Sequence, residues 1–81
     1  MGVRDLFARV MREAGLSAVL GSGLVARSLR DVGASVETAS EADYARALPR
    51  LEARLKTYLD PAQVARIGAT LRDALAQGAQ R

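Results

Sequence analysis

The chain contains no cysteine, histidine or tryptophan among its 81 residues, so neither a disulfide nor a cysteine–histidine zinc site can hold it together. A chain of this length forms one small domain and buries somewhat over ~60% of its unfolded surface. Apolar packing must therefore supply the stability, and either the helices pack well alone or a partner completes the core. The same absences remove the thiol nucleophile, the commonest metal ligand and the imidazole base. We therefore expect no enzyme, and we identify no catalytic, cofactor-binding or metal-binding residue.

Apolar residues recur every three or four positions over most of the chain, which predicts a single all-α domain spanning residues 1–81. The predicted helices cover approximately residues 3–14, 24–32, 41–59 and 61–76. They predict a small orthogonal array or bundle of four helices, or of five if Pro49 splits the third helix. The first helix ends at Gly15, and residues 16–20 are either a short helix or a buried extended segment. We expect Gly21-Ser22-Gly23 to break the chain.

Two helix starts carry local signals. Asp60-Pro61-Ala62-Gln63 offers an N-cap, a proline at the first helical position and a glutamine at the third. Before the third helix, a capping box can form in either of two frames, Thr38 with Glu41 or Ser40 with Asp43. The residues that we expect to be buried are Leu6, Phe7, Val10, Leu29, Leu48, Leu51, Leu55, Ile67 and Leu71.

The third predicted helix carries the candidate partner-binding residues. These are Tyr44, Arg46, Arg50, Arg54 and Tyr58. The apolar positions from Tyr44 to Tyr58 alternate between spacings of four and three residues, which is typical of a coiled-coil packing seam. The three arginines lie four residues apart and form one basic stripe if the helix is continuous. We expect Asp43 to pair with the first arginine, and Glu52 to pair with Lys56.

A glycine pattern supports a different interpretation. Gly21–Ala26 matches the phosphate-binding pattern G-x-G-x-x-G/A. Residues 18–38 resemble the first strand–helix–strand unit of nicotinamide- or flavin-dependent dehydrogenases. That resemblance implies strands at 18–20 and 35–37 and a nucleotide bound at the loop. The unit is about one helical turn shorter than usual, and residues 41–81 leave no further strands for a parallel sheet.

The charge pattern bears on nucleic-acid binding. The net charge of +3 arises from twelve basic residues, all arginine except Lys56, and nine acidic ones that are interspersed with them. This arrangement argues against a single strongly basic face. Residues 14–17 resemble the turn of a helix-turn-helix motif, with Ser17 capping the second helix. The following residues, 18–22, offer no Arg, Gln or Asn side chain to contact base edges.

These features predict a non-enzymatic helical protein–protein interaction module, such as an accessory subunit, an adaptor or a self-assembly domain. Its expected partner is another protein or a second copy of the chain. The alternative is a basic helical protein that binds nucleic acid through phosphate contacts. Nucleotide binding at Gly21–Ala26 is a third and more remote interpretation. No apolar run is long enough to span a membrane, and charged residues near the N-terminus exclude a secretory leader, so we expect a cytoplasmic protein.

Overall fold

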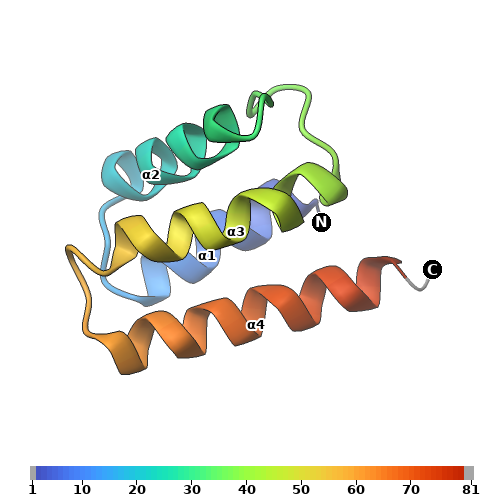
Figure 1. Cartoon of the computed structure of the whole chain (residues 1–81). Coiled ribbons are helices and arrows are strands. Elements are labelled where there is room, and N and C mark those ends of the chain that lie inside the picture. Colours follow the sequence, from blue (N-terminus) through green and yellow to red (C-terminus); the bar gives the residue numbers. More distant parts are fainter. Residues whose placement is uncertain (1, 80–81) are drawn as a thin grey trace.

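The computed structural model describes residues 2–79 as one antiparallel bundle of helices (Figure 1). The helices are α1 (Val3–Glu13), α2 (Ala18–Asp31), α3 (Glu41–Leu55) and α4 (Pro61–Ala79), and the described residues contain no strand. In Figure 1, α2 lies above and α4 below, with α3 in front and α1 behind. Both α2 and α4 pack against α1 and against α3, so the helices form a closed ring. The prediction of an all-α domain with four helices is confirmed.

The connection between α1 and α2 is short because glycine ends α1 sharply. Gly15 has a φ of +91°, in the left-handed region that glycine adopts without strain. The N–H of Gly15 donates to the carbonyl of Arg12 at 3.0 Å, and that of Leu16 donates to the carbonyl of Met11 at 3.2 Å. This is a Schellman motif, and the buried Leu16 provides the apolar contact that accompanies it. The predicted end of the first helix at Gly15 is therefore confirmed.

Helix α2 begins at Ala18, so the prediction of a helix over only 24–32 was wrong, as was the predicted break at Gly21-Ser22-Gly23. The cap at Ser17, which the helix-turn-helix resemblance implies, is present: its hydroxyl oxygen accepts from the N–H of Leu20 at 3.1 Å and starts the helix before the glycines. A glycine inside a helix costs only about 1 kcal/mol relative to alanine, so a capped and well-packed helix tolerates two of them.

The two glycines of α2 stand in different surroundings. Gly21 is buried against α1, and a Cβ built at this position would lie 2.9 Å from the Cβ of Met11. Glycine here lets the backbones of α1 and α2 approach closely. A Cβ built at Gly23 would meet no atom within 4 Å, so packing within the described chain does not require this second glycine.

The α2–α3 connection uses the same two devices as the α1–α2 connection, a glycine that ends one helix and a serine that caps the next. Gly33, with a φ of +81°, ends α2 in a second Schellman motif. Ser40 then caps α3: its hydroxyl accepts from the N–H of Asp43 at 3.2 Å, and its own N–H donates to the Asp43 carboxylate at 3.0 Å. Of the two predicted capping frames, the structure therefore adopts the one with Ser40 and Asp43. The hydroxyl of Thr38 instead shares a hydrogen bond of 2.8 Å with that of Ser35.

Helix α3 passes through Pro49 without splitting, so the five-helix alternative is wrong for the described residues. Proline lacks the N–H that would bond the carbonyl four residues earlier, at Ala45. Both residues lie on the exposed side of α3, where water can satisfy that carbonyl. The helix ends at Leu55 rather than at residue 59. Beyond it the chain tightens into turns, in which the N–H groups of Thr57 and Tyr58 donate to the carbonyls three residues earlier.

Helix α4 begins as predicted. The Asp60 carboxylate accepts from the N–H of Gln63 at 2.8 Å, and the Gln63 side chain accepts in return from the N–H of Asp60 at 3.4 Å.

The predicted pairing of Glu52 with Lys56 was wrong, because Glu52 forms an ion pair with Arg72 of α4. A Cβ built at Gly68 would collide with the Glu52 carboxylate, so this glycine leaves room for the α3–α4 ion pair.

The core lies where all four helices face each other. Every residue predicted to be buried is buried except Leu6, which is only partly buried. Leu6 lies at the edge of the apolar face of α1, whose centre is formed by Phe7, Val10 and Met11. The rings of Phe7 and Tyr44 meet edge to face, with centroids 4.8 Å apart, and join α1 to α3. None of the helices described is long and apolar enough to cross a membrane.

The two glycines of α2 predict opposite mutational effects. Gly21→Ala is expected to lower the free energy of unfolding, since overpacking against Met11 costs ~1–3 kcal/mol and the gain in helix propensity is at most ~1 kcal/mol. Gly23→Ala gains the same propensity without a clash and is expected to raise stability by up to ~1 kcal/mol. Urea midpoints measured side by side test this, and equal midpoints for the two variants would contradict the assigned packing.

Candidate interaction groove

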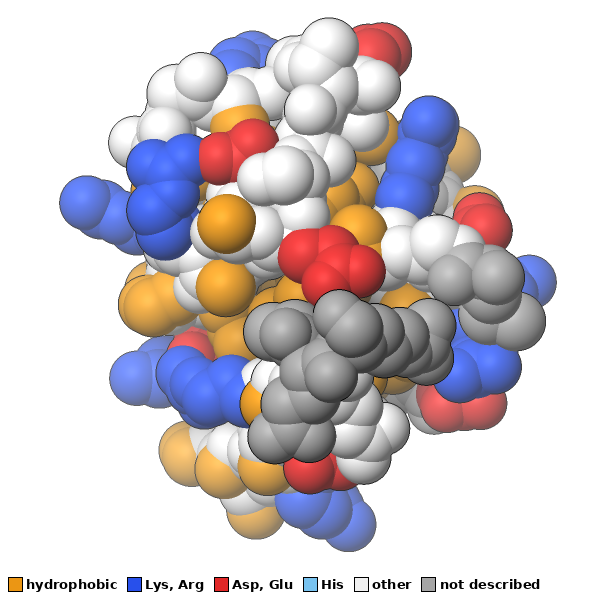
Figure 2. Space-filling view, turned by 90° about the vertical axis from the view of Figure 1, so that its right-hand side faces the viewer, with side chains coloured by type: hydrophobic (Ala, Val, Ile, Leu, Met, Phe, Trp, Pro, Cys, Tyr) orange, Lys and Arg blue, Asp and Glu red, His pale blue; other side chains and the backbone are white. Residues whose placement is uncertain are grey.

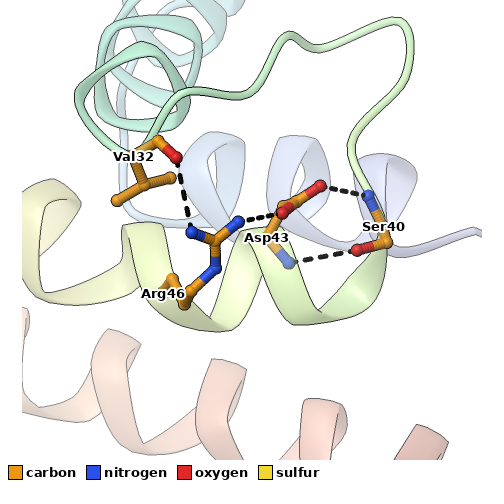
Figure 3. Close-up of polar contacts among 4 residues, drawn as sticks. All are labelled: Val32, Ser40, Asp43 and Arg46. Atoms are coloured by element: carbon orange, nitrogen blue, oxygen red, sulfur yellow. Dashed lines mark hydrogen bonds and ion pairs between the residues drawn. The ribbon is translucent and has the colours of Figure 1, made fainter.

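The arginine stripe predicted on α3 faces α2 and is partly used within the fold. Arg46 forms an ion pair with Asp43, and its guanidinium donates to the carbonyl of Val32 at 3.4 Å (Figure 3). Val32 is the C-cap of α2, so Arg46 joins the capping box of α3 to the end of the preceding helix. A cation is favoured there, because the last carbonyls of a helix carry partial negative charge. The predicted pairing of Asp43 with Arg46 is confirmed.

Arg54 makes an equivalent contact with α2, about two turns further along the same stripe of α3. Its guanidinium donates to the Asp31 carboxylate at 2.6 Å and reaches the buried hydroxyl of Ser28 at 3.4 Å. The hydrogen bond from Arg54 lowers the pKa of Asp31, and the charge of Arg50 acts in the same direction. Arg50 itself has no hydrogen bond or ion pair within the described chain. Two of the three arginines are therefore engaged in holding α2 against α3.

The two tyrosines predicted to contact a partner lie in different surroundings. Tyr44 is 1% exposed and belongs to the core. Tyr58 lies beyond the end of α3 in the connection to α4 and is 50% exposed. The apolar seam that starts at Tyr44 packs inward from Leu48 to Leu55, so it completes this bundle and does not form an open surface.

An open apolar surface occurs instead between α1 and α2. A groove of about 350 Å³ lies there, between Arg4 and Ala8 of α1 and an outward-facing stripe of α2. The stripe consists of small, uncharged side chains at helical spacing, namely Val19, Ser22, Gly23 and Ala26. Val19 is 84% exposed and is the most exposed large hydrophobic residue among those described. The Ser22 hydroxyl is satisfied by the carbonyl of Ala18 at 2.8 Å, so the stripe offers no free polar group.

A second hollow continues this groove toward the start of α2. It has a volume of about 360 Å³ and shares Arg4, Ala8 and Ser22 with the first. Its lining includes Met11 and Gly21, which pack against each other where α1 and α2 meet. The adjoining hollows form one channel along the α1–α2 seam, and we refer to this channel as the α1–α2 groove.

Tyr44 lines the α1–α2 groove at the end near the α2–α3 connection, together with Val36 and Glu37. Its hydroxyl is fully buried and has no hydrogen-bond partner among the described residues. Burial raises the pKa of this hydroxyl, while the positive charge of Arg4 acts in the opposite direction. An unsatisfied buried donor costs ~1–3 kcal/mol, so the hydroxyl is a polar group for which the described fold provides no acceptor.

The rim of the groove is basic. Arg4 and Arg12 line it from α1, and Arg30 continues the direction of the α2 stripe beyond Ala26. These three arginines make no hydrogen bond or ion pair with other residues in the range 2–79, unlike Arg46, Arg54 and Arg72 of α3 and α4. Figure 2 shows the end of the molecule where α1 begins: hydrophobic side chains reach the surface between the helices, and basic side chains lie around the edge together with acidic ones.

Sequence reasoning missed this groove because it broke α2 at its glycines. If residues 18–31 are treated as one helix, Val19, Ser22, Gly23 and Ala26 fall on one face, opposite the buried face of Leu24 and Ser28. The cap at Ser17 was the signal that could have joined the two halves. The hydroxyl of Tyr44 carried no such signal, because only the fold determines whether a buried hydroxyl finds an acceptor.

The other predicted chemistry finds little support in the geometry. Gly21–Ala26 lies inside α2, so the strand–loop–helix unit implied by the dehydrogenase resemblance is absent. The carboxylates of the described residues form no group of three that could hold a metal ion. A further hollow of about 300 Å³ lies between α1 and α4, but no unsatisfied buried side chain lines it. Comparison with protein families, curated proteins and solved structures gives no match to this chain.

The ion pairs that join α2 and α3 predict a loss of stability in acid. Hydrogen bonds from Ser40 and then Arg46 lower the pKa of Asp43 below its ordinary value of 3.8, and Arg54 lowers that of Asp31 likewise. Their contribution is therefore fully present above pH 3.8 and is lost as the pH falls through the lower folded-state pKa values. Asp43→Asn and Asp31→Asn are each expected to reduce stability at neutral pH and to flatten its decline in acid, as measured by urea unfolding at several pH values.

Asp73→Asn is the matched control, because Asp73 is exposed and accepts only from the side chain of Gln77. It should keep the acid dependence of the wild type. If Asp43→Asn and Asp31→Asn unfold in acid as the wild type does, the assigned ion pairs do not stabilise the fold.

Proposed function

We propose that the protein is a non-enzymatic interaction module whose α1–α2 groove binds a helix of a partner protein. The observation that carries the proposal is the uncharged stripe of Val19, Ser22, Gly23 and Ala26 beside a hollow of about 350 Å³. An uncharged stripe of small residues beside a hollow is a surface on which a second helix can pack closely, and exposed apolar patches mark interaction sites. The cytoplasmic location and the class of adaptor, accessory subunit or assembly domain stay predictions from the sequence.

The dimensions of the groove favour a helix as the ligand. The stripe from Val19 to Ala26 covers about two helical turns, or roughly 10 Å at 1.5 Å per residue. Small residues at the surface of a helix allow a second backbone to approach closely, as Gly21 does for α1 within the bundle. Gly23 lies open on the same stripe, where an alanine would favour the helix more. A helix of another protein packed closely at this position would explain why glycine stands there instead of alanine.

Nucleic-acid binding is the alternative function, and the unpaired arginines around the groove are the observation that favours it. The acidic residues among them dilute the basic field, and two arginines of the predicted stripe already hold Asp31 and Asp43. We therefore expect no measurable binding to random duplex DNA at 150 mM salt in fluorescence anisotropy. Binding that weakens with salt at a slope near −0.9 per phosphate contact would favour the alternative instead.

Site-specific photo-crosslinking in cells that naturally contain the protein tests the groove. A photoreactive amino acid at position 19 is expected to capture one defined protein, whereas the same group at position 53 on the outer side of α3 is not. Gly23→Leu in the first variant should remove the product by filling the groove without unfolding the helix. Equal products from positions 19 and 53, or a product insensitive to Gly23→Leu, would contradict the proposal.

A further inference from the structure

We propose that the α1–α2 groove receives an acidic side chain of the partner helix, whose carboxylate accepts hydrogen bonds from the Tyr44 hydroxyl and the Arg4 guanidinium. The inference rests on the proposed function and adds to it the chemistry of the partner. It follows from three observations: a fixed donor without an acceptor, an unpaired cation that lines the same hollow, and the charge around the groove.

The donor is the Tyr44 hydroxyl. The side chain is 1% exposed, and its ring is fixed edge to face against Phe7 at a centroid distance of 4.8 Å. The hydroxyl lacks a hydrogen-bond partner within residues 2–79, although Tyr44 lines the groove. Because the ring is fixed and Tyr44 lines the groove, a ligand bound there can offer this O–H the acceptor that the described fold does not provide.

The cation is Arg4. It lines both hollows of the groove, it is exposed, and it makes no hydrogen bond or ion pair with the rest of the described chain. It also lies in the first turn of α1, where the helix dipole disfavours a positive charge, so the fold gains nothing electrostatically from it there. Arg4 and Tyr44 both line the hollow of about 350 Å³, so both donors border the same space. A carboxylate can accept from both at once.

The surrounding charge distinguishes a different protein from a second copy of this chain. Arg12 extends the basic rim along α1, Arg30 lies one turn beyond Ala26 on α2, and Glu37 is the one acidic side chain that lines the hollow next to Tyr44. Two copies docked through their grooves would bring basic rims together, which is unfavourable. An acidic helix with small or apolar residues on its contact face complements both the rim and the stripe. Its carboxylate would lie near Glu37, so removing that charge should strengthen binding.

Selection from a displayed library of 18-residue helical peptides tests the proposal on the whole protein. We expect wild-type protein to enrich helices that carry Asp or Glu at one position beside small or apolar residues three and four positions away. With the Tyr44→Phe protein as bait, the acidic position should lose its enrichment. Enriched helices without a preferred acid would overturn the inference and leave the groove function standing. If no helix is enriched, or if the Gly23→Leu protein enriches the same ones, the groove function itself fails.

Binding constants of one selected peptide then measure the contact. Replacing its acid by the amide is expected to weaken binding to the wild type at least tenfold, and to Tyr44→Phe or Arg4→Gln less than threefold. Arg66→Gln makes the same charge change in the hollow between α1 and α4 and should leave the tenfold effect unchanged. Glu37→Gln should strengthen binding. An equal loss from the amide in every variant would overturn the assigned contact.

Thermal unfolding separates this role from a structural one. Tyr44→Phe removes only the hydroxyl, which has no partner in the described fold, so the melting temperature should stay the same or rise. A clearly lower melting temperature would mean that the hydroxyl already has an acceptor within the protein, and it would overturn the inference. A wild-type protein that is dimeric by light scattering, and whose dimer is lost in Gly23→Leu, would identify a second copy as the occupant and overturn it as well.

Discussion

The close approach of α1 and α2 at Gly21 fixes how these two helices pack and where the groove between them lies. Because Gly21 has no Cβ, the Cβ of Met11 can lie against the α2 backbone, and Met11 becomes 1% exposed. This contact brings the start of α2 close to α1, and the Schellman turn at Gly15 and the cap at Ser17 make the reversal possible in a few residues. Since α2 lies so close, its small side chains remain at the surface beside α1 and form the edge of the groove.

The sequence predicted correctly those helix ends that depend only on residues close together in the chain. The caps at Asp60 and Gly15 follow from hydrogen-bonding groups and backbone freedom within a few residues, and both appear as expected. The break expected at Gly21 failed because glycine has two roles that a sequence cannot separate: it ends helices, and it lets two helices approach. Only the position of Met11 on the neighbouring helix decides between these roles.

The candidate site was less predictable than the fold for a similar reason. Spacing alone identified Arg46 and Arg54 as a surface stripe, but their partners, Val32 and Asp31, lie on another helix and become neighbours only after folding. An alternating apolar seam likewise indicates a packing face without saying what packs on it. In this protein the seam from Tyr44 to Leu55 is covered by the bundle's own helices. The α2–α3 ion pairs and the buried seam are used within the fold, and the surface left open for a partner is the α1–α2 groove.

The four helices bury the core among themselves, so a partner is not needed to complete it. A thin core that needed help would make binding a condition of folding, whereas here the apolar side chains of α3 are already buried by α1, α2 and α4. Binding at the α1–α2 groove would then be reversible and independent of folding. Two features carry a cost in the isolated domain, namely Gly23 without a packing neighbour and the Tyr44 hydroxyl without an acceptor. Both adjoin the same groove, so a single ligand could offset both costs, and this coincidence distinguishes the groove from the other hollows of the bundle.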